Sequence, residues 1–168
     1  MGISLSRFKT PKNNMKKYKK KFEKDGFVLI KNFFNIIDAE KIVKIADELE
    51  TWKEQAYMWM IYYEKNMDNV KLKSRIENFI SYHQGMSFSI NQKLKPLVEY
   101  IYGEQMYLFK DKINWKYPGG KGFKAHQDHL AWSDFEPDRF LSMALFANKT
   151  TKENGCLEFG TEKRKKRN

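Results

Sequence analysis

The sequence has only one cysteine, Cys156, among its 168 residues. A single thiol cannot form a disulfide within the chain, so the sequence fits a reducing compartment, and we expect a cytoplasmic protein. It also has no apolar run near the about 18 to 20 residues that a membrane span needs, and the N-terminus lacks the apolar stretch of a signal peptide. We therefore expect no membrane association.

Net charge is absent from the middle of the chain. The formal net charge is +11, but residues 1–25 contribute +7 and residues 161–168 contribute +4, so residues 26–160 are neutral overall. A nucleic-acid groove would carry its basic residues on the folded surface near aromatic side chains. Charge at the ends is more typical of solvated tails. We expect no nucleic-acid partner, and binding through the basic ends remains the alternative.

The composition suits one folded domain. Apolar residues make up 41% of the chain and aromatic residues 15%, which is enough for a hydrophobic core and excludes compositional disorder. We divide the chain into a loose basic leader at residues 1–12, a single domain at residues 13–160 and a basic tail at residues 161–168.

Apolar residues at helical spacing predict four helices. Asn35 or Asp38 would cap the second helix at its N-terminus, and Gly26 and Gly103 would end the first and the last. The expected helices cover residues 14–25, a stretch from residue 35 or 38 onward, residues 70–80 and residues 87–102. Pro96 would interrupt the last of these unless that helix begins near it.

Short apolar or alternating runs predict strands, so we expect an α+β fold. The YPGG sequence at residues 117–120 predicts a turn, because proline suits its second position and glycine tolerates positive φ. The aromatic residues between positions 51 and 68 are expected to pack against the sheet, with a substrate lid as the alternative. The expected strands cover residues 27–30, 106–115, 139–147 and 155–159.

A histidine and an aspartate, His126 and Asp128, are separated by one residue. On an extended strand, side chains two positions apart point to the same face. An imidazole and a carboxylate on one edge are two members of the 2-His-1-carboxylate triad that binds non-haem Fe(II). The pair alone is weak evidence, because the chain has 21 acidic residues and a strand histidine bonded to its neighbour is an ordinary arrangement. His129 would face away from Asp128 on such a strand.

Three stretches together resemble the phytanoyl-CoA dioxygenase family. They are KINWKYPGGKGFKAHQDHLAW at residues 112–132, SRIENF at residues 74–79 and ENGCLEF at residues 153–159. The resemblance covers roughly residues 15–159. It implies an Fe(II)- and 2-oxoglutarate-dependent oxygenase that hydroxylates a small-molecule or acyl substrate. The fold that it implies has N-terminal helices packed on a cupin-like double-stranded β-helix, or jelly roll.

The same resemblance implies roles for individual residues. His126 and Asp128 would bind Fe(II), and Lys112 and Asn114, on the strand that enters the site, are candidates for contacting 2-oxoglutarate. An exposed lysine and a strand-end asparagine without such a role are the alternative. Trp132 is expected to form a wall of the substrate pocket.

The chain departs from the family pattern after Phe159. In the family, later strands carry a distal iron histidine and an arginine for 2-oxoglutarate, whereas this sequence continues with GTEKRKKRN and has no histidine beyond His129. We therefore expect a partial jelly roll lacking its last strands, either a truncated or frameshifted product or one completed by a separate chain. A catalytically inactive fragment or a non-catalytic binding protein is the alternative function. Neither the substrate nor the oligomeric state follows from the sequence.

Overall fold

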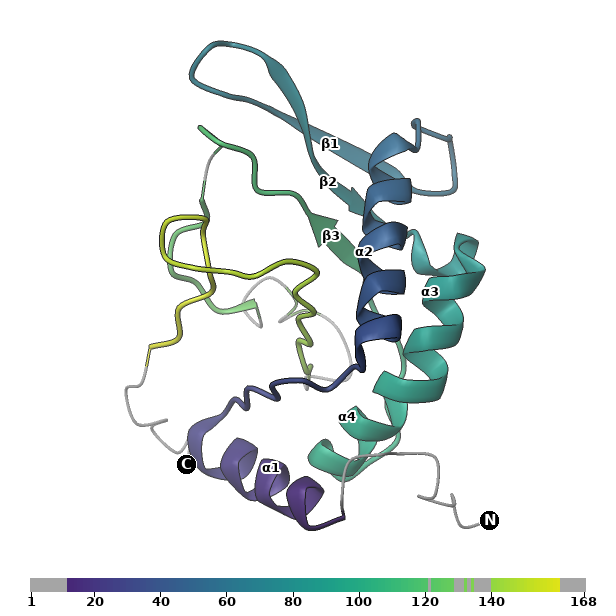
Figure 1. The fold of residues 1–168 in the computed structure, drawn as a ribbon, viewed down its shortest axis with the longest axis vertical. Coiled ribbons are helices and arrows are strands. Elements are labelled where there is room, and N and C mark those ends of the chain that lie inside the picture. The colour runs from purple at the N-terminus through teal and green to yellow at the C-terminus, as the bar shows by residue number, and fades with distance from the viewer. Residues whose placement is uncertain (1–11, 121, 129–131, 133, 135–139, 161–168) are drawn as a thin grey trace.

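The computed structural model describes residues 12–120, 122–128, 132, 134 and 140–160. Figure 1 shows α1 and α4 together at one end of the molecule and a small sheet at the other. The expected leader and tail lie almost wholly outside the described residues. The elements in chain order are α1 (Lys12–Asp25), α2 (Ile36–Thr51), β1 (Met60–Lys65), β2 (Lys71–Glu77), the 3-10 turn η2 (Ile80–Tyr82), α3 (Gln84–Ser89), the π-helical turn η3 (Ile90–Leu94), α4 (Lys95–Tyr102) and β3 (Lys112–Asn114).

Helix α2 begins as expected and is fixed at both ends. The side chain of Asn35 accepts a hydrogen bond from the Asp38 amide at 2.9 Å, which confirms Asn35 as the N-cap. At the other end, the Lys73 ammonium donates to the carbonyls of Glu50 and Trp52. Burial lowers the pKa of Lys73. The last carbonyls of a helix have no backbone N–H partner within it, and Lys73 provides the donor for the carbonyls of Glu50 and Trp52.

Residues 71–77 form the central strand of the sheet, so the helix expected over residues 70–80 is wrong. The sheet has the order β1-β2-β3 with antiparallel pairing, and Ile76 lies between Ile61 and Ile113. In this strand Leu72 pairs with Glu64 and Ile76 with Ile61, so the two lie on opposite faces, but their spacing of four residues is by itself compatible with both a helix and a strand. Pairing with the neighbouring strands, which the local spacing does not contain, decides between the two.

A β-bulge divides β2 into two parts that face different ways. Arg75 pairs with Tyr62, but Lys73 pairs with the next residue, Tyr63, so Ser74 is the extra residue. Directly paired residues share a face and consecutive residues do not. Lys73 therefore points toward α2, whereas Arg75 points to the opposite side of the sheet.

One face of the sheet packs on the helices and forms the main core. Ile61 and Ile76 are buried there, and Ile113 and Trp115 pack against them. The expected packing of the aromatic segment is confirmed for Trp52 and Trp59, which also contact this core, whereas Tyr57 is exposed. The buried members of this core are Leu49, Ile61, Ile76, Phe79, Ile80 and Met86.

A second, smaller core joins α1 to α4 through Met15, Leu97 and Ile101. Residues 27–30 pack here through Val28 and Ile30. The strand expected over residues 27–30 is therefore wrong. Its apolar residues are partly buried against helices, and no described strand lies beside it to share hydrogen bonds.

The single helix expected over residues 87–102 is interrupted. The chain forms α3, then the π-helical turn η3, and then α4 with Pro96 in its first turn. Proline has no backbone N–H and its ring clashes with the carbonyl four residues earlier, so a regular helix cannot run through it. The wider turn of η3 lets the chain continue in nearly the same direction. Gly103, with φ +95°, ends α4 as expected.

The later strands are shorter than expected or absent from the described residues. The strand expected over residues 106–115 is confined to Lys112–Asn114, and residues 140–160 form no strand, so the strands expected at residues 139–147 and 155–159 are wrong over their described part. A strand needs a neighbouring strand for its backbone hydrogen bonds, and none of the described strands pairs with residues 140–160.

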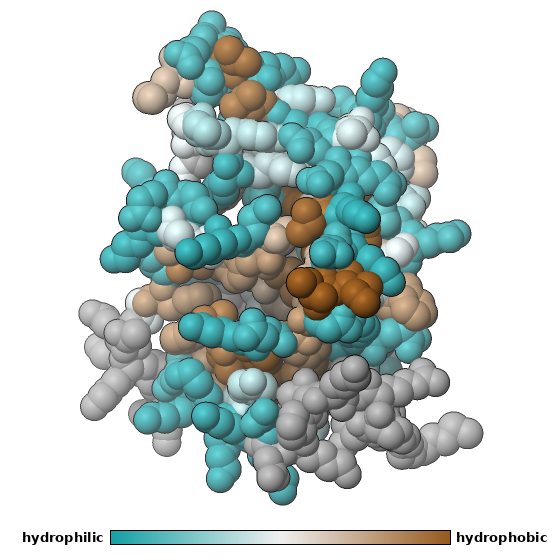
Figure 2. Space-filling view, viewed as in Figure 1, coloured by the Kyte–Doolittle hydropathy of each residue, from teal (hydrophilic) through white to brown (hydrophobic). Residues whose placement is uncertain are grey.

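Several large apolar side chains of residues 140–160 are exposed, and Figure 2 shows apolar residues at the surface in separate patches among hydrophilic ones. The expected α+β class holds as helices on a small antiparallel sheet. In the part of the chain that the structure describes, no helix is both long enough and apolar enough to cross a membrane.

Candidate functional site

The face of the sheet opposite the main core carries polar side chains. Tyr62, Arg75 and Glu77 lie on this face, because Arg75 pairs with Tyr62 and Glu77 lies two residues beyond Arg75. In β3, Asn114 pairs with Arg75 and Lys112 pairs with Glu77. Lys112 and Asn114, the candidates for contacting 2-oxoglutarate, therefore lie on this polar face, and both are exposed.

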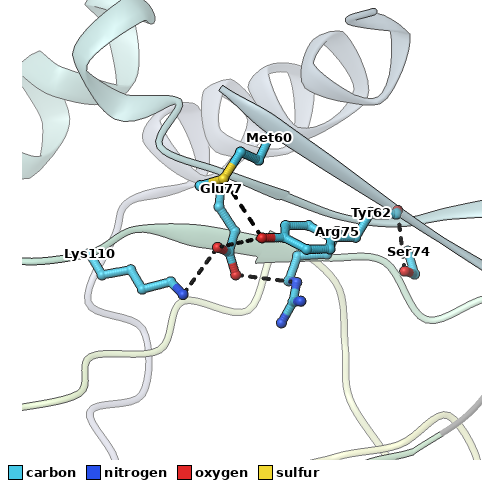
Figure 3. Close-up of polar contacts among 6 residues, drawn as sticks. All are labelled: Met60, Tyr62, Ser74, Arg75, Glu77 and Lys110. Carbon is cyan, nitrogen blue, oxygen red and sulfur yellow. Dashed lines mark hydrogen bonds and ion pairs between the residues drawn. The ribbon is translucent and has the colours of Figure 1, made fainter. Parts of the chain in front are cut away.

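A buried carboxylate, Glu77, stands at the centre of the polar face (Figure 3). Its residue is only 2% exposed. Glu77 Oε1 lies 3.3 Å from Arg75 Nε, and Oε2 lies 3.0 Å from Lys110 Nζ and accepts a hydrogen bond from the Tyr62 hydroxyl at 3.4 Å. The Arg75 guanidinium carbon lies 4.1 Å from the centre of the Tyr62 ring. One carboxylate thus holds two cations, and one of these is also stacked on an aromatic ring.

This cluster was not predicted from the sequence. Arg75 and Glu77 belong to SRIENF, which was noted for its family resemblance only, and a helix was expected there. In a helix, residues two apart do not face each other, whereas on a strand they share a face. A strand assignment for residues 71–77 was the signal that could have found the cluster.

A cavity of about 300 Å³ lies beside Lys110 and Glu77. The Phe109 and Trp132 rings meet edge to face with centroids 5.1 Å apart, and Lys110 Nζ lies 5.1 Å from the centre of the Trp132 ring. Trp132, expected to form a pocket wall, lines this cavity. Its lining residues are Met60, Glu77, Asn78, Phe109, Lys110, Asp111 and Trp132.

The expected iron ligands, His126 and Asp128, come together without a strand. Residues 126 and 127 are in neither helix nor strand, so the strand setting was wrong. Even so, His126 Nε2 lies 3.4 Å from Asp128 Oδ1. The other nitrogen, Nδ1, lies 2.6 Å from the Lys124 carbonyl, and the Ser142 hydroxyl donates to Asp128 Oδ2 at 2.8 Å. Local hydrogen bonds, not a pleated strand, orient the two side chains.

This arrangement fits two neighbouring ligands of a metal ion. A carbonyl only accepts hydrogen bonds, so Nδ1 donates to Lys124, and Nε2 is the nitrogen that faces the Asp128 carboxylate, the orientation in which a histidine binds a metal through Nε2. Two ligands each about 2.1 Å from a metal and about 90° apart lie about 3 Å from each other. Among residues 12–120, 122–128, 132, 134 and 140–160, no three His, Cys, Asp or Glu side chains form a cluster that could hold a metal, and His129 is outside these residues.

The expected turn at residues 117–120 connects the two parts of the site. The Gly120 amide donates to the Tyr117 carbonyl at 3.0 Å, and Gly119 has φ +74°, a conformation that glycine adopts readily. The Tyr117 hydroxyl donates to the Glu50 carboxylate. Burial, with a further contribution from this hydrogen bond, raises the pKa of Tyr117. The turn is therefore fixed to α2 between the polar strand β3 and the His126 segment.

The remaining histidine, His83, has a structural role. It is buried, and its Nδ1 accepts a hydrogen bond from the Met86 amide at 3.1 Å, which caps α3. Its Nε2 lies 3.5 Å from Glu48 Oε2. In this position, His83 connects the start of α3 to α2.

Comparison with known proteins identifies relatives over most of the chain. The family described as phytanoyl-CoA dioxygenase (PhyH) matches residues 22–167. A 2-aminoethylphosphonate dioxygenase from Uncultured bacterium HF130_AEPn_1 is 40% identical over 141 residues, which are 83% of this chain and 54% of the relative. A methylphosphonate hydroxylase from Gimesia maris is 30% identical over 143 residues, which are 84% of this chain and 54% of the relative.

A more distant relative from Stutzerimonas stutzeri is named "Probable alpha-ketoglutarate-dependent hypophosphite dioxygenase". It is 27% identical over 139 residues, which are 79% of this chain and 47% of the relative. The chain thus spans about half the length of these curated relatives. No solved structure matches it.

Proposed function

We propose, from the premise that this chain belongs to the phytanoyl-CoA dioxygenase family, that it contributes to an Fe(II)- and 2-oxoglutarate-dependent dioxygenase. The cupin-like jelly roll is the fold that membership of the family implies for the complete domain, and the three-stranded sheet described here would form part of it. A reducing compartment such as the cytoplasm suits both the single thiol and ferrous iron.

The observation that carries this proposal is the His126–Asp128 pair. Nε2 and Oδ1 face each other, and the Lys124 carbonyl and the Ser142 hydroxyl engage the two outer atoms. Such outer hydrogen bonds fix the tautomer and orientation of metal ligands. His126 and Asp128 would hold the ion on adjacent positions and leave the rest of its coordination sphere for other ligands.

Lys112 and Asn114 would contact 2-oxoglutarate from β3. Their exposed side chains offer an ammonium and an amide on the polar face, and both groups can donate to carboxylate oxygens. Fe(II) and 2-oxoglutarate supply the oxidising chemistry when bound. The chain's own contribution would be to hold the ion through His126 and Asp128 and to bind the acidic cosubstrate from the polar face of the sheet.

The proposed substrate class is a small anionic molecule. The relatives described above are named for 2-aminoethylphosphonate, methylphosphonate and hypophosphite, which are small phosphorus oxyanions. The cavity of about 300 Å³ is at the small end of ligand pockets and suits a ligand of this size.

An anaerobic titration of the purified chain with Fe(II) and 2-oxoglutarate tests this proposal. We expect a saturable metal-to-keto-acid charge-transfer band, because the keto acid binds directly to the ion. His126→Ala should abolish the band. Ser142→Ala should weaken Fe(II) binding about tenfold to 100-fold, because Asp128 loses its hydrogen bond. Ser89→Ala, which removes a hydroxyl bonded to the Gly85 carbonyl in α3, is the matched control and should have no effect.

The absence of a band in a folded wild-type chain would contradict the proposal and favour a non-catalytic binding protein. A band of unchanged strength in His126→Ala would show that Fe(II) binds elsewhere.

A further inference from the structure

We infer that Arg75 and Lys110, held in place by the buried carboxylate of Glu77, form the binding site for the oxyanion of a small phosphonate- or carboxylate-bearing substrate. The role as a substrate site rests on the proposed function, but the contacts that support it are different from those of the His126–Asp128 pair. It gives a role to the SRIENF segment, which the metal pair and the keto-acid residues do not use.

The charge balance of the cluster favours an anion. Glu77 carries one negative charge, and Arg75 and Lys110 carry two positive charges at 3.3 and 3.0 Å from it. Among the described residues, Glu77 is the only carboxylate within ion-pair distance of either cation. Lys112, which pairs with Glu77 in the register of β2 and β3, adds a further positive charge on the same face. Among the described residues of this cluster, positive charge therefore exceeds negative charge, and this balance favours an anionic ligand.

The other carboxylate beside the cavity, that of Asp111, is engaged elsewhere. Its Oδ2 accepts hydrogen bonds from the backbone amides of Phe79 and Ile80, at 2.8 and 2.9 Å. The Asp111 carboxylate is therefore hydrogen-bonded to the backbone at the start of η2. Glu77 therefore remains the carboxylate that organises the cations.

The geometry points to positioning as the function of Glu77. A buried charge is costly to desolvate, and a buried ion pair is often no more stabilising than apolar residues of the same volume. Arg75 and Lys110 keep 28% and 37% of their side chains exposed, whereas the Glu77 side chain is 3% exposed. Glu77 therefore holds both cations from the buried side, and part of each cationic side chain remains exposed to solvent. The guanidinium fork is suited to bind two oxygens of a carboxylate or phosphonate at once.

Two further contacts make the cations rigid before a ligand binds. Arg75 is stacked on the Tyr62 ring, and the Tyr62 hydroxyl is bonded to the same carboxylate that pairs with the guanidinium. Lys110 lies against the Trp132 ring. A side chain fixed in advance loses less conformational entropy on binding, so the affinity for the ligand is greater. Trp132 and Phe109 provide an apolar wall for the carbon part of a small substrate.

Calorimetric titration of the full chain with methylphosphonate tests the inference. Arg75→Gln and Lys110→Gln should each weaken binding at least about tenfold, because each removes a charge-assisted hydrogen bond. Arg75→Lys should restore less than half of the lost affinity on a logarithmic scale, because the ammonium lacks the fork. Glu77→Gln should weaken binding about threefold to tenfold with both cations still present. Thermal unfolding shows that each variant is folded, and the partly exposed Arg75 and Lys110 decide the matter if Glu77→Gln does not fold.

The matched control is Lys71→Gln. Lys71 is a cation on the same strand and lies 4.0 Å from the centre of an aromatic ring, that of Tyr63, but it pairs with Lys65 and lies on the other face. Its replacement removes the same charge and should change methylphosphonate binding by less than about twofold.

The charge-transfer titration with 2-oxoglutarate separates this inference from the proposed function. We expect its midpoint to change by less than about twofold in Arg75→Gln. An equal loss of both ligands, or a loss of 2-oxoglutarate alone, would overturn the inference by assigning the cluster to structure or to the keto acid. No methylphosphonate binding in a wild-type chain that forms the band would also overturn it, and the proposed function would stand. Methylphosphonate binding without the band would support the oxyanion site and contradict the oxygenase.

Discussion

The two faces of one three-stranded sheet differ in what they contribute to the protein. On one face, Ile61, Ile76 and Ile113 pack against helices and exclude water. On the other, the residues next to Ile76 in sequence, Arg75 and Glu77, form an ion pair, and Glu77 also lines a cavity. The same backbone supports both, because side chains alternate between faces. The comparison suggests that stability and ligand binding are assigned to opposite sides of the same strands. Three predictions test this separation, and a fourth concerns an ion pair outside the sheet as a reference.

The largest effect is expected from Ile76→Ala. Ile76 has no exposed surface and lies at the centre of the apolar face, so the substitution removes buried methyl groups and leaves a cavity. The free energy of unfolding should fall by about 2–5 kcal/mol. Denaturant unfolding measures the change. Val70→Ala, a similar truncation at an exposed position just before β2, should cost less than about 0.5 kcal/mol, and equal losses for both variants would contradict the assignment of the core.

A smaller loss is expected from Asp111→Ala, which affects the junction of the two faces. The Asp111 carboxylate binds the amides of Phe79 and Ile80 and so joins the segment before β3 to the segment after β2. Leaving these donors without a partner should cost about 1–3 kcal/mol. Asp111→Asn keeps one acceptor oxygen and should lose less. Hydrogen exchange of the Phe79 and Ile80 amides provides the direct measurement, and unchanged protection in Asp111→Ala would refute this role.

A weaker and pH-dependent effect is expected from the ion pair between Lys93 and Asp38, which lies away from both faces. The hydrogen bond from Lys93, together with the charges of Lys93 and Lys41, holds the pKa of Asp38 below its ordinary value. A carboxyl with a lowered folded-state pKa stabilises the fold above its unfolded-state pKa of about 3.9, and this contribution is lost as the pH falls through the folded-state value.

Lys93→Met should therefore lower the free energy of unfolding by less than about 1 kcal/mol at pH 7, because the pair is near the surface. The difference from wild type should shrink as the pH falls below about 4. Denaturant unfolding of both proteins across this range measures it. A difference that grows on acidification would have the wrong sign for this ion pair.

The smallest effect on stability is expected on the polar face. Replacing the whole cluster, as Arg75→Met, Glu77→Leu and Lys110→Met together, should change the free energy of unfolding by no more than about 1 kcal/mol in either direction, because no charge is left buried without a partner. The same variant should lose methylphosphonate binding. A loss of stability comparable to that of Ile76→Ala would show that the two faces are not separate in function.

Sequence patterns predicted the elements whose determinants are local. The cap at Asn35, the ends of helices at Gly26 and Gly103 and the turn at residues 117–120 depend on residues within a few positions of one another. The strand at residues 71–77 and the short extent of β3 could not be predicted in this way. Their backbone partners are distant in sequence, and the spacing of Leu72 and Ile76 is compatible with a helix as well.

The sequence alone determined the family, through motifs that the match over residues 22–167 confirms, and it provided His126 and Asp128 at the spacing of a ligand pair. Only the tertiary structure decided that Glu77 is buried between Arg75 and Lys110, since this depends on the register of the sheet, on the bulge at Ser74 and on a residue 33 positions away in the chain. Local chemistry can be read from neighbouring residues. Which side chains share a face is set by the pairing of strands, and that pairing is a property of the folded chain.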